Sequence, residues 1–88
     1  MDDDYWVYVL RNDTGKFYIG LTADLIHRVE QHNAGKSTWT RKYGPWEKVW
    51  HSGPMSLTEA RKLEHWLKRQ KGGAGFFART GLSRSSGS

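Results

Sequence analysis

Two side chains with reactive chemistry lie one helical turn apart in the stretch KFYIGLTADLIHRVEQHN, residues 16–33. Arg28 and His32 are spaced i, i+4, which puts both on one stripe of a helix. At 100° per residue, that stripe borders the apolar face formed by Leu25 and Val29. A planar guanidinium suits charge that develops on a phosphoryl group. The ordinary alternative is a rim arginine that reaches solvent and a rim histidine that is only hydrogen-bonded.

Glu64 is a carboxylate on the apolar face of a predicted second helix, where leucines recur at helical spacing. A glutamate there is costly to bury unless it is paired or binds a metal. It could form a structural ion pair with Arg28, or it could hold a hard cation at the floor of a pocket. A neutral glutamate packed in the core is the weakest interpretation. One carboxylate suits Mg²⁺, which keeps most of its waters and completes its shell with phosphate oxygens.

Two tyrosines are predicted to share one face of a β-hairpin. If Arg11 pairs with Phe17, then Tyr8 faces Gly20 across the hairpin, and alternation places Tyr18 on the same face as Tyr8. Gly20 would leave space above the backbone opposite Tyr8. Packing alone could explain this pattern, because tyrosine is common in strands and glycine there can mark a bulge.

These side chains need five elements to position them. The predicted elements are strands over residues 6–10 and 17–21, a helix from Thr22 or Asp24 to about Asn33, a strand over 46–51 and a helix over 57–71. The order β-β-α-β-α predicts an α+β fold with a three-stranded antiparallel sheet flanked by helices. It allows a short further element around Phe76 and Phe77. The phenols, the arginine, the histidine and the carboxylate could then converge between the sheet and the two helices.

The composition limits the classes of protein. With 88 residues, we expect one domain over residues 1–82 and a disordered Ser/Gly tail over residues 83–88. No cysteine is present, which excludes disulfides and cysteine-based zinc sites. No apolar run is long enough to span a membrane, and the acidic start is unlike a signal peptide. We therefore expect a cytoplasmic protein without a membrane partner.

The charge is unevenly distributed along the chain. The net charge is +5, and ten of the 14 basic residues but three of the nine acidic ones fall from Arg41 onward. Clustered positive charge indicates a polyanionic partner such as nucleic acid, although a solvated basic surface is an equally simple interpretation. Together with the candidate residues, this positive charge favours an enzyme that cleaves phosphodiester bonds.

Several of these residues occur in an order that resembles the GIY-YIG nuclease superfamily. Trp6-Val7-Tyr8 is similar to the first half of the family motif, with tryptophan in place of glycine, and Tyr18-Ile19-Gly20 matches the second half ten residues later. Residues 25–33 resemble the family's arginine-bearing helix, and Glu64 to Lys68 resemble the helix with its metal-binding glutamate. Residues 43–47 look like the segment before the third strand in small stand-alone bacterial members. The segment GGAGFFARTGLSR has no role that we can assign.

The resemblance implies a role for each matching position. Tyr8 and Tyr18 correspond to the paired active-site tyrosines, one of which would help to deprotonate the attacking water. Arg28 would stabilise the transition state, His32 would orient or activate the tyrosine, and Glu64 would hold the single divalent metal ion, Mg²⁺ or Mn²⁺.

The resulting interpretation is an endonuclease acting on DNA, branched or single-stranded DNA included, with RNA not excluded. The basic and aromatic residues that would contact the nucleic acid are Lys16, Arg41, Lys42, Tyr43, Arg61, Lys68, Arg69 and Lys71. Two alternatives stay open: a nucleic-acid-binding module with a vestigial nuclease pocket, and a domain in which Glu64 and Arg28 are only a structural pair. The oligomeric state is not predicted.

Overall fold

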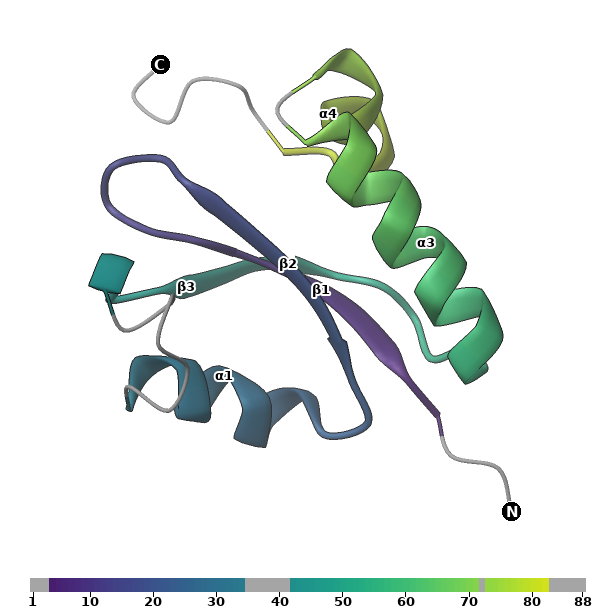
Figure 1. Cartoon of the computed structure of the whole chain (residues 1–88), viewed down its shortest axis with the longest axis horizontal. Helices are drawn as coiled ribbons and strands as arrows, with labels where there is room; N and C mark the ends of the chain where they lie inside the picture. Colours follow the sequence, from purple (N-terminus) through teal and green to yellow (C-terminus); the bar gives the residue numbers. More distant parts are fainter. Residues whose placement is uncertain (1–3, 35–41, 72, 83–88) are drawn as a thin grey trace.

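The computed structural model describes residues 4–34, 42–71 and 73–82. The elements follow the order β1, β2, α1, β3, α3 and α4 (Figure 1), which confirms the predicted α+β fold. The strands form one antiparallel sheet in the order β2-β1-β3, so β2 and β3 are its edges. The tail over residues 83–88 lies outside the described residues. No helix within the described ranges is long and apolar enough to cross a membrane.

The hairpin has the register that the sequence predicts. β1 (Trp6–Arg11) pairs with β2 (Phe17–Thr22), with Arg11 opposite Phe17 and Tyr8 opposite Gly20. β-branched and aromatic residues favour both strands, and Gly15 adopts a φ of 91° in the turn that joins them, a conformation open to glycine at little cost. β3 (Glu47–His51) pairs with the other side of β1 and completes the three-stranded sheet.

Three helices cover the two faces of the sheet. α1 (Leu25–Asn33) begins after Asp24, whose side chain accepts a hydrogen bond from the backbone N–H of His27. Asp24, not Thr22, is therefore the N-cap of this helix. α3 (Leu57–Gln70) is capped by Ser56 in the same way. α4 (Ala74–Thr80) is the short further element that the sequence allowed.

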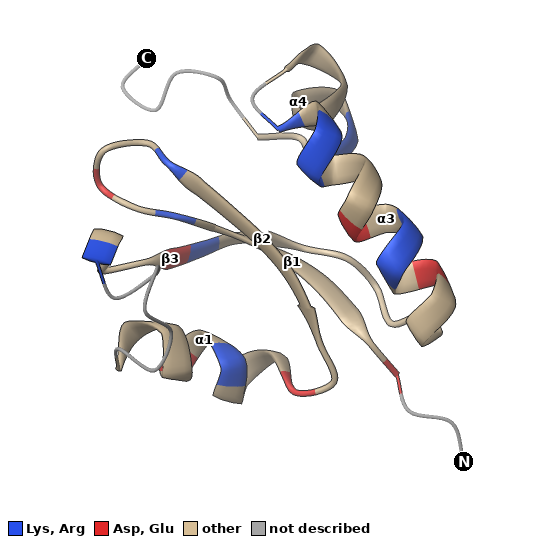
Figure 2. Ribbon diagram, in the orientation of Figure 1, with Lys and Arg blue, Asp and Glu red and all other residues tan. Residues whose placement is uncertain are grey.

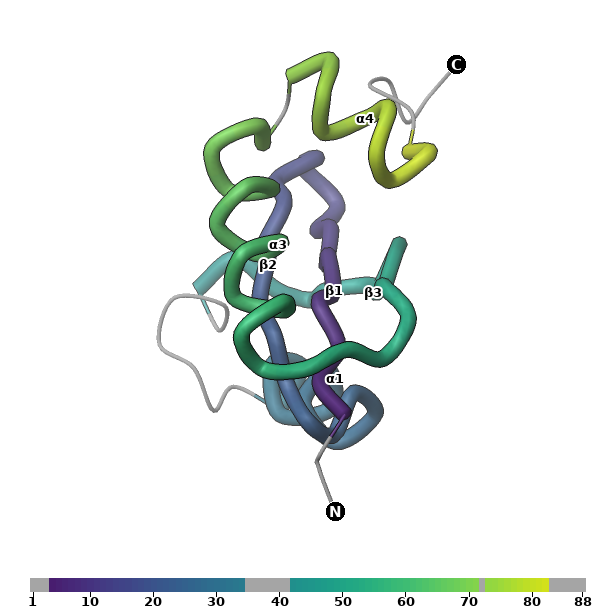
Figure 3. Tube along the Cα trace, turned by 90° about the vertical axis from the view of Figure 1, so that its right-hand side faces the viewer, coloured from purple at the N-terminus to yellow at the C-terminus, as the bar shows by residue number. Residues whose placement is uncertain are grey.

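The helices lie on opposite sides of the sheet, with α1 on one side and α3 and α4 on the other (Figures 1 and 3). Two apolar cores result. The α3-side core contains Val7, Val9, Ile19, Ala60, Leu67 and Phe76, all buried. The α1-side core contains Tyr8, Leu10 and Trp46, with Tyr18, Leu25, Val29 and Tyr43 packed against it. Alternation along β1 divides its residues between the two cores. The segment that had no assigned role therefore contributes Phe76, which is fully buried, to the α3-side core.

Candidate functional site

Tyr8 lies at the centre of the candidate site. Its side chain belongs to the α1-side core, and 1% of the residue is exposed. The ring crosses over Gly20 of the neighbouring strand, where a Cβ atom would lie 2.6 Å from the phenolic oxygen. Because no real Cβ fits at that distance, glycine at position 20 is what allows the phenol of Tyr8 to reach over β2.

A chain of three polar side chains passes through this phenol. Arg28 Nε donates a hydrogen bond to the Tyr8 oxygen at 3.4 Å, and that oxygen lies 2.9 Å from His32 Nε2. Since Arg28 can only donate, the O–H of Tyr8 is free to donate to His32. The Tyr18 ring stands edge-on to the His32 ring, with centroids 4.7 Å apart, and lies 6.3 Å from the Tyr8 ring. The structure thus brings together the four residues predicted to be catalytic.

Burial controls the protonation of this chain. Burial lowers the pKa of His32 to about 4, and the positive charge of Arg28 adds to this effect. Burial also raises the pKa of Tyr8 to about 12, although its hydrogen bond from Arg28 acts in the opposite direction. At neutral pH the pair is therefore a phenol and a neutral imidazole, and Nε2 accepts from Tyr8 in the tautomer that carries its proton on Nδ1. Both pKa shifts keep the proton on the phenol in the resting protein.

Asn33 and Trp46 are part of the site, and sequence reasoning missed them. The Asn33 amide donates to the Trp46 carbonyl at 2.9 Å and accepts from the Trp46 N–H at 2.7 Å. This pair of bonds fixes the buried Trp46 ring 6.3 Å from the ring of Tyr18. The available signal was an asparagine next to the predicted apolar face of α1, because a polar residue there needs a partner.

Glu64 approaches the site from the other side of the sheet. It lies on α3, and 17% of its side chain is exposed. Its Oε2 atom forms an ion pair with Lys68 Nζ at 3.2 Å, while Arg28 Nη1 donates to Gln31 at 3.1 Å. Among the described residues, the partner of Glu64 is therefore Lys68 and not Arg28. Its negative charge is nevertheless one of the causes that raise the pKa of Tyr8.

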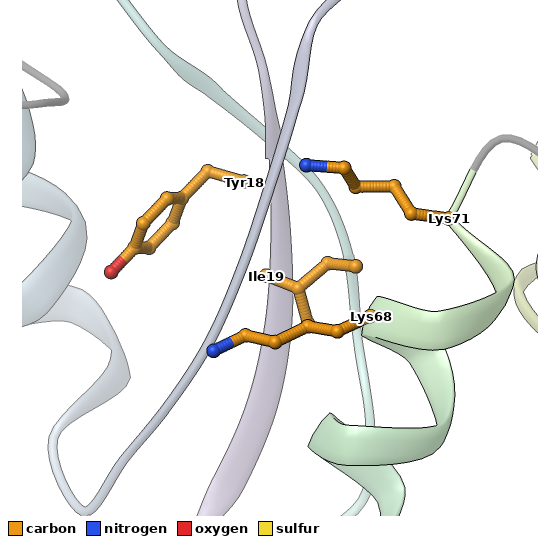
Figure 4. A pocket seen from close by; sticks show the side chains of 4 residues that line it. All are labelled: Tyr18, Ile19, Lys68 and Lys71. Atoms are coloured by element: carbon orange, nitrogen blue, oxygen red, sulfur yellow. The ribbon is translucent and has the colours of Figure 1, made fainter.

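A groove at the edge of the sheet connects these two sides. It has a volume of about 390 Å³ and is lined by Tyr18, Ile19, Lys68 and Lys71. Figure 4 shows the two lysines reaching from α3 toward β2, whose Tyr18 points away from α3. The candidate residues thus lie around the β2 edge. We had expected them to converge on one face of the sheet, between it and both helices. The physical reason is that α1 and α3 cover opposite faces.

The chemistry of the donor set suits a hard cation that is only partly held by protein. Within the part of the chain that the structure describes, no three His, Cys, Asp or Glu side chains gather as a metal site. Glu64 offers one partly exposed carboxylate, which already binds a cation, the ammonium group of Lys68. A cation such as Mg²⁺ could take that place and complete its shell with water and phosphate oxygens.

The predicted nucleic-acid contacts form separate groups of positive charge (Figure 2). Lys42 is the chain neighbour of Tyr43, whereas Lys16 lies far from it in the sequence. The ammonium groups of Lys16 and Lys42 lie 5.2 and 5.6 Å from the centroid of the Tyr43 ring. Lys68 and Lys71 line the groove at β2. Arg61 and Arg69 line a hollow on α3. Arg41, the remaining predicted contact, lies outside the described residues.

Comparison with known proteins adds independent information. The family model described as the GIY-YIG catalytic domain matches residues 4–75. A UPF0213 protein of Streptococcus pneumoniae serotype 4 is 39% identical over 72 residues, which cover 81% of this chain and 73% of the relative. A UPF0213 protein of Oceanobacillus iheyensis is 34% identical over 70 residues, covering 78% and 81%. One from Yersinia enterocolitica is 37% identical over 71 residues, covering 78% and 73%. No solved structure matches.

Proposed function

This chain belongs to the GIY-YIG family of catalytic domains, which is of nuclease type, and from that premise we propose that it is a metal-dependent endonuclease that hydrolyses DNA in the cytoplasm. One observation carries the proposal: Arg28, Tyr8 and His32 form a connected hydrogen-bonded chain beside the groove at β2. A buried phenol–imidazole pair bonded to a partly exposed arginine is more than a core needs. It can move a proton and stabilise anionic charge at one place.

The proton transfer follows from the protonation states. A water placed against the Tyr8 oxygen gives its proton to that oxygen, while the Tyr8 O–H proton moves to His32 Nε2, 2.9 Å away. Tyr8 therefore accepts one proton as it releases another and never carries a full negative charge. The pKa of about 4 keeps His32 neutral at pH 7. It also makes the imidazole a weak base, so the proton moves to Nε2 only as the water attacks the phosphorus. Tyr18, packed against the imidazole, limits its orientation.

Arg28 and Glu64 act on the phosphate. The guanidinium of Arg28 approaches from the α1 side and stabilises the charge that accumulates on the phosphoryl oxygens. Glu64 would hold one Mg²⁺ or Mn²⁺ ion from the α3 side, and the chemistry that such an ion would supply is neutralisation of negative charge on the phosphate and the leaving oxygen. The groove at the β2 edge lies between the two and would receive the backbone of the nucleic acid.

The basic groups support a DNA substrate on both sides of this groove. Lys16, Lys42 and Tyr43 extend the positive surface beyond the hairpin turn, with Arg41 next to them in the chain. Lys68, Lys71, Arg61 and Arg69 continue it along α3. Such contacts reach phosphates and carry no base readout, so we propose a preference for DNA shape, branched or single-stranded, over DNA sequence.

The deciding experiment is cleavage of branched, single-stranded and duplex DNA with Mg²⁺ or Mn²⁺, against an EDTA control, by the wild type and Glu64→Gln. The amide is nearly isosteric with the carboxylate but is a much poorer ligand, so cleavage should be lost while the thermal unfolding midpoint stays close to that of the wild type. A Glu64→Gln protein that cleaves at the normal rate would remove the metal role. If the wild type binds DNA and never cleaves it, the chain is a binding module instead.

A further inference from the structure

The groove at β2 contains two lysines in different electrostatic situations. Lys71 Nζ donates to the backbone carbonyl of Phe17 at 3.2 Å, so its positive charge has a neutral partner. Lys68 Nζ is paired with the carboxylate of Glu64 at 3.2 Å. Only the charge of Lys68 is therefore compensated, and the residue that compensates it is the one proposed to hold the metal.

The pair is well placed to exchange partners. Glu64 is the less accessible member, with 17% of its side chain exposed, while 54% of the Lys68 side chain is exposed. The carboxylate is thus fixed between α3 and the sheet, and the ammonium can leave it without moving the helix. Because the Lys68 side chain is more than half exposed, water screens the pair and can rehydrate the ammonium, so the cost of separating the pair is small.

We propose that Lys68 is an exchangeable counter-ion that occupies Glu64 in the free protein and moves to a phosphate of the nucleic acid when a divalent cation takes its place. This inference rests on the proposed function and gives Lys68 a positioning role in it. Lys68 prevents an unpaired carboxylate from repelling the phosphate backbone before the metal arrives. Once the cation is bound, the ammonium is released into the groove that it shares with Tyr18 and Lys71.

Two consequences follow for binding. In the free protein, Lys68 competes with the cation for one carboxylate, so it weakens metal affinity. On the nucleic acid, Lys68 contributes only when the metal has displaced it, so metal and DNA strengthen each other's binding. A lysine that was merely another surface contact would bind phosphate equally well with or without metal.

The first test is Mn²⁺ affinity, measured by electron paramagnetic resonance on the free wild-type protein, Lys68→Met, Lys48→Met and Glu64→Gln. Lys48→Met is the matched control, because it removes the same charge from β3, the opposite edge of the sheet. Lys68→Met should bind Mn²⁺ about tenfold more tightly, the effect of a unit charge about 6 Å from a divalent ion in a water-like dielectric. Lys48→Met should resemble the wild type, and Glu64→Gln should bind least.

The second test is affinity for a DNA duplex in EDTA and in Ca²⁺ at equal ionic strength. Lys68→Met should bind slightly more weakly than the wild type in EDTA, where Glu64 is left unpaired, and several-fold more weakly in Ca²⁺, where the wild type gains the Lys68 contact with a phosphate. An equal loss in both conditions, or Mn²⁺ affinity unchanged by Lys68→Met but abolished by Glu64→Gln, would overturn the role of Lys68 alone. Mn²⁺ binding that Glu64→Gln leaves intact, or no binding by any variant, would overturn the metal role of Glu64 and this inference with it.

Discussion

Tyr8 connects the residues that the sequence presents as separate candidates. Its oxygen accepts from Arg28, faces His32 and lies over Gly20, and it is almost fully buried. Burial keeps the phenol protonated at neutral pH, with a pKa of about 12. The roles of its neighbours can be separated by measurement.

Arg28→Ala should lower the rate of cleavage far more than the affinity for DNA. The guanidinium acts on charge that appears in the transition state, and the loss of one such donor costs roughly 10²–10³ in rate. Ground-state affinity loses one phosphate contact among several. Arg28→Lys should not restore full activity, since lysine lacks the planar fork. Single-turnover cleavage and equilibrium binding, measured side by side, provide the comparison, and a proportional fall in both would reduce Arg28 to a binding residue.

His32 should make stability depend on pH in a specific range. Its pKa is about 4 in the folded protein and about 6.5 when unfolded. Between these values the unfolded chain binds a proton that the folded one does not. Stability is therefore fully present above about pH 6.5 and falls as the pH decreases toward 4, by up to about 3 kcal/mol.

Urea denaturation of the wild type and His32→Gln between pH 7 and pH 4 would measure this contribution. The amide can still accept from Tyr8 but does not titrate, so the variant should lose less stability over that range. Carboxylates titrate in both proteins and cancel in the difference. Parallel profiles would show that His32 is not held neutral by the fold.

At the scale of elements, the hairpin and α1 do most of the positioning. The β1–β2 register sets Tyr8 opposite Gly20 and puts both tyrosines on the α1 side, and the helical repeat of α1 places Arg28 and His32 over them. These relations were predictable, because strand alternation and helical spacing are local properties. The same alternation places Ile19, the neighbour of Tyr18, in the α3-side core.

Other relations depend on contacts between distant segments, which local spacing does not contain. The sequence pattern did not show that α1 and α3 cover opposite faces of the sheet. We therefore did not foresee that Glu64 and Tyr8 would lie on opposite sides of it. The bonds from Asn33 to Trp46 join residues 13 positions apart in the chain. The place of Phe76 depends on α4 packing against the sheet. The ion pair between Glu64 and Arg28, one of the alternatives left open, rested on complementary charge alone, whereas the structure pairs Glu64 with Lys68, one turn away.

Gly20→Ala should damage both the hairpin and the site. The new methyl group would meet the Tyr8 oxygen at 2.6 Å and Cζ at 2.8 Å, and the buried ring has little room to move. Overpacking of this kind costs roughly 1–3 kcal/mol, and displacement of the phenol should also lower the rate of cleavage. Urea denaturation and single-turnover cleavage would measure the two effects.

Gly53→Ala is the matched control, because nothing lies within 4 Å of a Cβ at that position. Its stability should differ from that of the wild type by less than about 0.5 kcal/mol. If both variants were equally stable and active, the close approach of Tyr8 to β2 would not matter for the site.

At the scale of the whole molecule, positive charge is distributed around the groove. The groups at the hairpin end, at β2 and along α3 are separate in the structure (Figure 2). Affinity should therefore come from several weak contacts and not from one site. Such a surface favours nucleic acid without selecting its sequence.

DNA affinity should fall steeply with salt concentration. Each phosphate neutralised on a duplex contributes roughly −0.9 to the slope of log affinity against log salt, so a slope that reflects several contacts is expected. Lys71→Gln should reduce the slope by about one contact, while Lys48→Gln at the far edge of the sheet should leave it unchanged. Fluorescence anisotropy over a series of salt concentrations measures both, and a slope near zero would contradict the polyanion partner.

The position of the groove at an edge strand also bears on solubility. β2 is an outer strand of the sheet, and an uncovered strand edge is a template on which a second copy of the chain can add its own strand and begin to aggregate. The groove cannot be closed by a protective helix if nucleic acid is to enter it. Lys71, bonded to the Phe17 carbonyl on that edge, brings like charges face to face whenever two copies approach through β2. The lysine proposed to attract a phosphate backbone should therefore also oppose strand addition at this edge.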